Sequence, residues 1–454
     1  MVRRLSDRLQ AAAAQVDLTP AAGTTMGGYM QRGDQTARGT HDPLEGAILW
    51  LHIPGTPRRD FVWVAIDAVA VDHELSRRIA RALADRIGAD PDGVVVCASH
   101  SHSGPAGWLK DLPHGLGERE DEPMRAELVD RLAQAAASLP RALQPVRPVF
   151  GEGRASGVGA NRNDPRGPHD DSFGVLGLLD AAGQVRALVL DYASHPTVLG
   201  HDNLLWSADY PGAARRGLVS ALSALGLGEP VVIFLQGAAG DVSSRFVRRA
   251  QDFTEVSRLG GLLAASVLRC LLEARVEESR GTPLRWFRET VQLPTRLLPS
   301  PARASAQVDA AAAAWRGIAA RQERTPEERI ARTRYEGALL LARLASSGLP
   351  PTIDLPVSVA VLHETAWVHL PVELFASLGL AIRDASPFRR TRVIGYADGY
   401  AGYVADTAGF EGGVYEAASS LFDAAGGRQL VNAVTGFVAG VHASLEPEAV
   451  TIAD

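Results

Sequence analysis

Two histidines stand two residues apart in the segment Ser99-His100-Ser101-His102-Ser103-Gly104-Pro105, directly after the apolar run Val94–Ala98. Residues two apart on an extended chain point to the same side, so both imidazoles can reach one metal ion. Alternatively, one ring binds a metal while the other handles protons. A His-x-His pair at a strand end also occurs without a metal, so the pair alone leaves metal binding open.

Three later apolar runs also end in side chains that can bind a metal or supply a hydroxyl. They are residues 187–192, leading to His195; residues 231–235, leading through Gly237–Gly240 and Asp241 to Ser243; and residues 366–370, leading to Glu373 at an expected helix start. In open α/β sheets, ligands bind at the carboxyl ends of the strands. We therefore expect the four polar clusters to meet at one place.

The residue types in these clusters indicate zinc. Histidine and carboxylate ligands from distant segments, without cysteines, are typical of a catalytic zinc that keeps one position open for water. Zinc lowers the pKa of its bound water and polarises a carbonyl group, and amide hydrolysis needs both effects.

Each residue also has an ordinary interpretation. His195 alone fits a hydrogen-bonded structural histidine, and Glu373 alone fits a carboxylate that stabilises a helix N-terminus. The glycines at 237–240 fit a plain turn, or a phosphate-binding loop that lacks its lysine. Only the combination favours a catalytic site.

Alternating strand and helix patterns surround these clusters. The apolar run Phe61–Val71 is followed by helical periodicity over Glu74–Ile87 and by a buried strand at Gly93–Ala98. Further strands are expected at residues 175–179, 185–192, 231–235 and 357–370, and further helices at residues 211–225, 256–272 and 372–385. The alternation predicts the α/β class, with a mixed sheet covered by helices and the zinc site at the strand ends.

The composition changes between about residues 294 and 349, where alanine, arginine and glutamate predominate. Ala304–Gln322 and Thr325–Ala345 are predicted to be two helices joined near Pro326. We interpret them as a helical insertion or lid. It either shapes an acyl pocket or simply packs against the remainder of the domain. No internal repeat or low-complexity tail is present, so residues 1–454 are interpreted as one domain.

The overall composition excludes several classes of protein. The 454 residues carry a net charge of -6 without a dense basic block, which argues against nucleic-acid binding. Cys97 and Cys270 lie in apolar stretches, and we expect buried structural thiols. No run approaches the ~18 apolar residues that cross a membrane. Ala11–Ala14, after Arg3 and Arg4, is too short for a signal peptide. We expect a soluble, cytoplasmic protein of undetermined oligomeric state.

Taken together, several segments resemble the neutral, non-lysosomal ceramidases. Ser99–Pro105 resembles the Thr-His-Thr-His-Ser-Gly-Pro segment of that family. The other segments follow in the family's order with similar spacing: Val16–Pro20, Met26–Tyr29, His41–Leu44, Asn161-Arg162, Gly240–Ser243, Pro371–Glu373, and Tyr403 to Tyr415-Glu416. Each segment is weak alone, but the ordered set is specific and covers nearly the whole chain.

Carried over position by position, the resemblance implies one zinc ion per chain. The implied ligands are His100, His195, Glu373 and Tyr403. His102 would lie beside the metal and handle the proton. Ser243 occupies the position of the family's essential serine, which acts either as nucleophile or as a residue that orients substrate and water. Arg162 and Tyr415 match residues that bind the substrate head and stabilise the oxyanion.

Two departures from the family pattern bear on the substrate. Ceramidases carry an additional C-terminal immunoglobulin-like domain, and this chain ends before one could fit. Many of them also have Asp-Val-Ser-Pro-Asn, where this chain has Ser244 and Arg245 in the last two positions. The resemblance implies an amidohydrolase for a ceramide-like or other small N-acyl molecule. The alternatives are an esterase or acyltransferase with the same zinc site, and a non-catalytic binding module.

Overall fold

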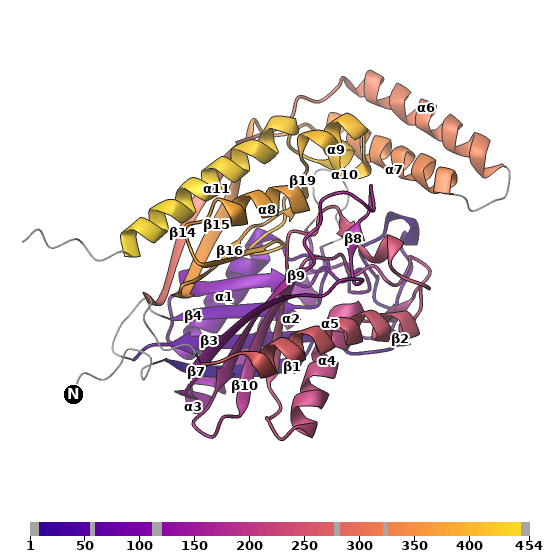
Figure 1. Cartoon of the computed structure of the whole chain (residues 1–454). Coiled ribbons are helices and arrows are strands. Elements are labelled where there is room, and N and C mark those ends of the chain that lie inside the picture. The colour runs from indigo at the N-terminus through magenta and orange to yellow at the C-terminus, as the bar shows by residue number, and fades with distance from the viewer. Residues whose placement is uncertain (1–8, 55–59, 111–119, 277–281, 321–325, 446–454) are drawn as a thin grey trace, which may run out of the picture.

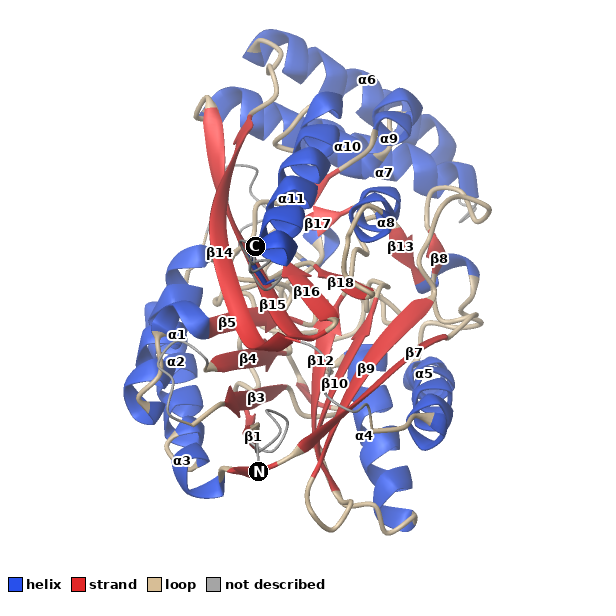
Figure 2. Cartoon of the chain, turned by 60° about the vertical axis from the view of Figure 1, so that its left-hand side comes forward, coloured by secondary structure: helices blue, strands red, loops and turns tan. Residues whose placement is uncertain are grey.

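The computed structural model describes residues 9–54, 60–110, 120–276, 282–320 and 326–445. Three sheets of four or five strands form the centre of the molecule, and helices cover their outer faces (Figures 1 and 2). Each sheet is mixed, because it contains antiparallel pairs and one parallel pair at an edge. The alternation of strands and helices therefore follows the sequence pattern.

The first sheet is built from the N-terminal third of the chain. Its strands, in spatial order, are β5 (Val94–Ala98), β4 (Phe61–Ile66), β3 (Glu45–His52), β1 (Gln10–Asp17) and β6 (Gln144–Pro145). The helices α1 (His73–Ile87), α2 (Glu122–Ala136) and α3 (Leu139–Ala142) pack on its outer face. The Asp72 carboxylate caps α1, and Gly88 ends it in the left-handed conformation.

The second sheet follows directly along the chain. Its strands, in spatial order, are β12 (Val231–Gln236), β10 (Val185–Tyr192), β9 (Ser172–Leu179) and β7 (Arg147–Arg154). The helices α4 (Asp209–Ala224) and α5 (Phe253–Glu273) cover its outer face, each with a stripe of buried apolar side chains.

The third sheet comes from the C-terminal part. Its strands, in spatial order, are β14 (Thr282–Pro294), β15 (Thr352–His363), β16 (Thr365–His369) and β18 (Arg390–Ile394), and it packs against α8 (Ala376–Asp384) and α11 (Ala424–Leu445). The insertion between β14 and β15 forms the helical hairpin α6 (Pro301–Ala319) and α7 (Pro326–Ser347), which lies beside α10 (Tyr415–Ser419).

Shorter elements connect these layers. They are β2 (Gly39–Thr40), β8 (Ala160–Asn161), β11 (Leu205–Trp206), β13 (Val242–Ser243), β17 (Glu373–Leu374), β19 (Tyr403–Val404), α9 (Thr407–Gly412), and the 3₁₀ turns η2 (Met30–Arg32), η3 (Pro91–Gly93) and η4 (Ser244–Phe246).

The parallel pairs β4–β5, β10–β12 and β16–β18 bring the polar clusters together. The inner faces of the three sheets share one apolar core that includes Trp63, Leu235 and Ile394. The Gln236 side chain, fully buried at the end of β12, donates to Ser99 O at 3.1 Å and to Ser194 O at 2.9 Å. One amide thus ties the ends of β5 and β10 to β12. The structure therefore confirms the prediction that these strand ends converge.

A buried ion pair fixes the end of β4 beside this point. Arg215 on α4 contacts both carboxylate oxygens of Asp67, at 2.9 and 2.5 Å, and both side chains are buried. We expect Asp67→Ala to lower the free energy of unfolding by about 3–5 kcal/mol, because it leaves a buried guanidinium without its main partner. Glu127→Ala, which breaks an exposed pair with Arg131, should cost less than about 1 kcal/mol. Urea denaturation measures both values; an equal cost would contradict the prediction.

Two expectations are corrected here. Glu373 does not begin a helix: it lies in β17, which pairs with β19, and α8 begins three residues later. Cys97 is buried, but Cys270 is only half-buried. Two predictions lie partly outside the described residues: the N-terminal segment with Arg3 and Arg4, and the junction of the two helices at 321–325. In the described part of the chain, no helix has both the length and the apolar character needed to cross a membrane.

Candidate metal centre

The two histidines of the first motif lie at the end of β5. The backbone of His100 is in the left-handed region, with φ of 66°, so the extended chain expected for the pair is wrong. The rings nevertheless meet: their centroids are 4.7 Å apart, and His102 Nε2 is 3.2 Å from His100 Nε2. The strained turn brings both rings to one point, and such outliers are concentrated at functional sites.

Backbone carbonyls orient two of the histidines. His100 Nδ1 lies 2.5 Å from Val69 O, and His195 Nδ1 lies 2.7 Å from Ala239 O. A carbonyl oxygen only accepts hydrogen bonds, so each Nδ1 carries the proton. In a neutral ring, Nε2 then presents its lone pair. This is the arrangement that prepares a histidine to bind a metal.

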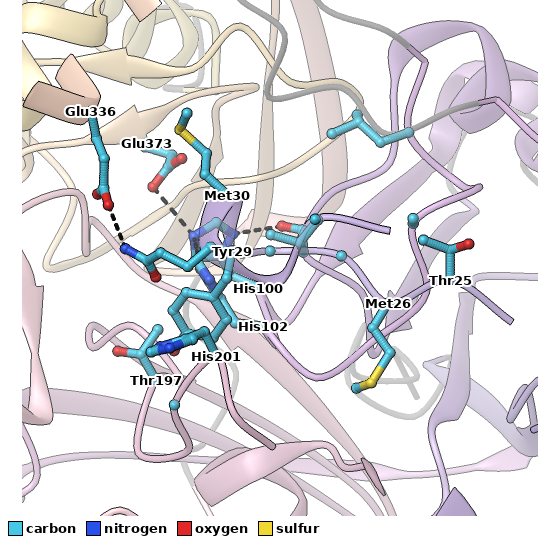
Figure 3. Close-up of a pocket in the computed structure, with 18 of the residues that line it drawn as sticks. Thr25, Met26, Tyr29, Met30, His100, His102, Thr197, His201, Glu336 and Glu373 are labelled. Atoms are coloured by element: carbon cyan, nitrogen blue, oxygen red, sulfur yellow. Dashed lines mark hydrogen bonds and ion pairs between the residues drawn. The ribbon is translucent and has the colours of Figure 1, made fainter. Parts of the chain in front are cut away.

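Both lone pairs face the same carboxylate, and Figure 3 shows the contact between His100 and Glu373. Glu373 Oε2 is 3.3 Å from His100 Nε2 and 3.0 Å from His195 Nε2. Burial, together with nearby Arg162 and His100, lowers the pKa of His195 to about 3, so this ring is neutral at pH 7. His195 Nε2 is buried and makes no hydrogen bond to the described residues. A lone pair and a carboxylate oxygen repel each other at this distance unless a cation lies between them.

Two tyrosines that the sequence analysis did not single out hold Glu373. The Tyr400 hydroxyl donates to Glu373 Oε1, and the Tyr396 hydroxyl donates to Oε2 at 3.4 Å. Tyr396 also stacks on His100, with ring centroids 4.1 Å apart. The sequence contained a signal for these two residues. Together with Tyr403 they place three tyrosines within eight residues, directly after the strand that ends at Ile394.

Tyr403 is placed beside the centre by β-pairing. In the β17–β19 pair, Tyr403 is the partner of Glu373, and its ring lies parallel to that of His195 at 6.5 Å. Arg162 Nη2 donates to the Tyr403 hydroxyl at 3.0 Å, and Arg162 Nε donates to Glu416 at 2.5 Å. Tyr403 and Arg162 therefore form one edge of the site.

Ser243 lies on the adjoining edge. It forms an isolated bridge with His195, and its side chain is buried. Asp241 fixes the preceding turn, since its carboxylate accepts from Ala376 N at 2.7 Å and from Asn161 Nδ2 at 2.6 Å. Gly240 is required there, because a Cβ would lie 2.6 Å from Glu373 O.

His102 differs from the other two histidines. It is half-buried, and its Nδ1 has no hydrogen-bond partner in the part of the chain that the structure describes. Tyr29 packs on its ring at 4.9 Å, and Arg32 donates to its carbonyl at 2.9 Å. Gly28, with φ of 89°, passes so close that a Cβ would lie 2.8 Å from His102 Cα. His102 is thus positioned by the N-terminal loop rather than by a carbonyl on its ring.

A cavity of about 1370 Å³ opens onto this centre. Its lining includes His100, His102, Ser243, Arg162, Glu373, Tyr403 and Tyr415. The helix α7 forms part of the wall with polar side chains: Arg332, Thr333, Glu336 and Arg343. Glu336 accepts from Gln31 Nε2 at 2.6 Å and so joins α7 to η2 across the cavity (Figure 3).

The structure thus brings all eight predicted site residues into one region. The donor set fits a metal ion: the ring nitrogens of His100, His102 and His195 lie within 4.8 Å of one another, and Glu373 contacts two of them. The ligand roles and the proton-handling role stay predictions.

Comparison with known proteins agrees with the resemblance seen in the sequence. Residues 10–255, more than half of the chain, match the family model described as "Neutral/alkaline non-lysosomal ceramidase, N-terminal". Neutral ceramidase A of Dictyostelium discoideum is 26% identical over 249 residues, covering 50% of this chain and 34% of that protein. Neutral ceramidase of Pseudomonas aeruginosa is 23% identical over 388 residues, covering 73% of this chain and 57% of that protein.

Solved structures agree on the fold. The crystal structure of the Pseudomonas aeruginosa neutral ceramidase matches 98% of this chain and 76% of that chain, with a TM-score of 0.76 at 19% identity. The structure of a ceramidase complexed with C2 has the same TM-score of 0.76, at 18% identity. The match covers 98% of this chain and 77% of that ceramidase chain. The predicted α/β class is confirmed. Because the family model covers more than half of its residues, this chain belongs to the neutral/alkaline non-lysosomal ceramidase family.

Proposed function

We propose that this chain is a zinc-dependent amidohydrolase that cleaves the N-acyl amide bond of a ceramide-like or other N-acylated small molecule. The observation that carries the proposal is the convergence of three imidazole nitrogens and the Glu373 carboxylate beside a large cavity. Membership of the ceramidase family and similarity to neutral ceramidases support the same reaction.

His100, His195, Glu373 and Tyr403 would hold the metal. Zinc, when bound, supplies a Lewis acid for the amide carbonyl and lowers the pKa of water. The carbonyls behind His100 and His195 and the tyrosines behind Glu373 keep these donors aimed at one point.

The remaining residues would act on the substrate. Arg162, fixed by Glu416 and Tyr403, presents a planar positive charge toward the carbonyl oxygen. Burial raises the pKa of Tyr415, so its phenol stays protonated and can donate to the developing oxyanion. His102 lines the cavity, with its Nε2 3.2 Å from His100 Nε2, and would pass the proton to the leaving amine.

Metal analysis tests the proposal most directly. Protein purified without chelators should contain about one equivalent of zinc per chain, and removing it should abolish hydrolysis of short-chain ceramides and other N-acyl amines. Adding zinc back should restore the activity. Less than about half an equivalent, with no gain in activity on adding zinc, would rule out a zinc enzyme.

Ser243 is expected to orient the substrate or water rather than to form an acyl-enzyme. Among the described residues, the Ser243 hydroxyl accepts from Arg245 N at 3.3 Å, whereas a serine nucleophile needs a base or a bound metal ion to activate it, and Ser243 is not in the proposed ligand set. Ser243→Ala should therefore lower kcat by about 10²–10³-fold. Acid-quenched wild-type reactions should show no acyl adduct by mass spectrometry. An adduct on Ser243 would instead establish the covalent route.

A further inference from the structure

Arg32 places a buried guanidinium beside the candidate centre. It is the last residue of the 3₁₀ turn η2, and only 1% of its surface is exposed. Its donors reach backbone carbonyls of three chain segments: Nη1 donates to Gly27 O and, at 2.9 Å, to His102 O, Nη2 to Gly200 O at 3.5 Å, and Nε to His201 O at 3.4 Å. One side chain therefore joins the N-terminal loop to the chain that follows β5 and to the chain that follows β10.

Tyr29 extends this restraint to the imidazole of His102. The guanidinium carbon of Arg32 lies 5.1 Å from the centroid of the Tyr29 ring, and the Tyr29 and His102 ring centroids are 4.9 Å apart (Figure 3). The Tyr29 hydroxyl donates to Leu199 O at 2.7 Å, which fixes the far end of the ring. Arg32 thus holds the backbone of His102 directly, and it supports the aromatic ring that packs on the imidazole.

The orientation of His102 depends on these contacts. A backbone carbonyl holds Nδ1 of His100 and of His195, whereas His102 Nδ1 has no hydrogen-bond partner among the described residues. A group that transfers a proton must keep its nitrogen within hydrogen-bond reach of the reacting atoms. A shift of His102 should therefore slow the reaction and leave the implied metal ligands in place.

The set of carbonyls around Arg32 suits arginine better than lysine. A guanidinium is planar and has donors in several directions, whereas a lysine ammonium carries its three donors on one atom. Because three different nitrogens of Arg32 reach the carbonyls, a single ammonium at the same place reaches fewer of them. Arg32→Lys therefore keeps the buried charge and loosens the attachment of His102.

We propose that Arg32 is a positioning residue for His102: it holds the His102 carbonyl itself and the His102 ring through Tyr29, so that the imidazole stays where it can pass a proton. The proposal rests on the proposed amidohydrolase function, in which His102 handles the proton. Arg32 is not among the described residues that line the cavity, so its effect on the reaction passes through His102.

The kinetics of Arg32→Lys test this role with zinc-loaded protein and an N-acyl amine that the wild-type enzyme cleaves. We expect kcat to fall about 10- to 100-fold, with KM changed less than about threefold, because a small misplacement of a reacting group slows the chemical step. Zinc content should not change. Arg38→Lys is the matched change at an exposed arginine of the same loop, and it should keep the wild-type kcat. A folded Arg32→Lys protein with unchanged kcat overturns the proposal.

A double-mutant cycle identifies the residue through which Arg32 acts. In a His102→Ala background, Arg32→Lys should change kcat less than about twofold, since the group that it positions is gone. Losses that multiply in the double variant, or a His102→Ala protein with wild-type kcat, overturn the proposal. If Arg32→Lys does not fold, Tyr29→Leu takes its place in the cycle with the same expectations, because it removes the ring between Arg32 and His102.

Chemical labelling gives a readout that needs no activity. Diethyl pyrocarbonate modifies accessible imidazoles. On zinc-free protein, mass spectrometry should show that His102 reacts at least about threefold faster in Arg32→Lys than in the wild type, because a less restrained ring opens to solvent more often. His52, on β3, serves as the internal reference and should react equally in both proteins. If the wild type cleaves no N-acyl amine, the proposed function fails and the labelling decides the inference: faster reaction of His102 supports it, and an equal rate overturns it.

Discussion

Replacing His195 or Glu373 with alanine is expected to remove the proposed zinc and most of the activity. His195 Nε2 is buried, lacks a hydrogen bond and lies 3.0 Å from Glu373 Oε2, so both variants lose a donor aimed at the same point. A metal that polarises a carbonyl contributes several kcal/mol, so the rate should fall by about 10³-fold or more. Zinc content, measured by mass spectrometry, should fall in parallel with kcat.

Two controls keep this result specific. Glu373→Gln preserves the size of the side chain and removes its charge, so it should lose zinc while keeping the native circular dichroism. His52→Gln changes a half-buried histidine at the end of β3 and should retain full zinc and activity. A Glu373→Ala protein that still binds one equivalent of zinc would show that this carboxylate is not a ligand.

His102→Ala is expected to keep most of the zinc and to lose about 10²–10⁴-fold in kcat, the range that general acid–base groups contribute. Unlike His100 and His195, His102 has no carbonyl on its Nδ1, so nothing on the ring fixes Nε2 as a donor to metal. Its Nε2 is 3.2 Å from His100 Nε2, close enough to pass a proton near the centre.

Tyr403→Phe provides the matched comparison. It removes one hydroxyl from the implied ligand set and leaves the ring that lies parallel to His195. We expect weaker zinc binding from this variant and near-normal zinc binding from His102→Ala, both measured by competition with a chelator. The opposite order would make His102 the ligand and Tyr403 a partner of Arg162 alone.

Much of the site follows from local sequence. Buried strands precede His100, His195, Ser243 and Glu373 in the chain. Polar residues that follow such strands are therefore expected at the edge of the sheet. Helix patterns were equally local: Glu74–Ile87 was predicted, and α1 spans His73–Ile87.

Other features depended on partners distant in sequence. Glu373 looked like a helix start because α8 follows closely, but pairing of β17 with β19 makes it a strand residue. The extended conformation expected at His100 fails because the backbone turns to bring Nδ1 to Val69 O. Tyr396 and Tyr400 lie in the loop between β18 and β19, and they contact Glu373 of β17 across 23 and 27 residues, which no spacing rule encodes.

By itself, the sequence determined the fold class, the family and the set of residues that can do chemistry, because strand and helix periodicity and ordered motifs are local properties. Only the tertiary structure decided which histidine nitrogens present lone pairs, which tyrosines hold the carboxylate, and that Arg32 holds the backbone of His102. Those properties depend on hydrogen bonds and packing between segments more than 300 residues apart, such as Val96 and Asp398 at 302 residues. They therefore arise only when the three sheets pack together.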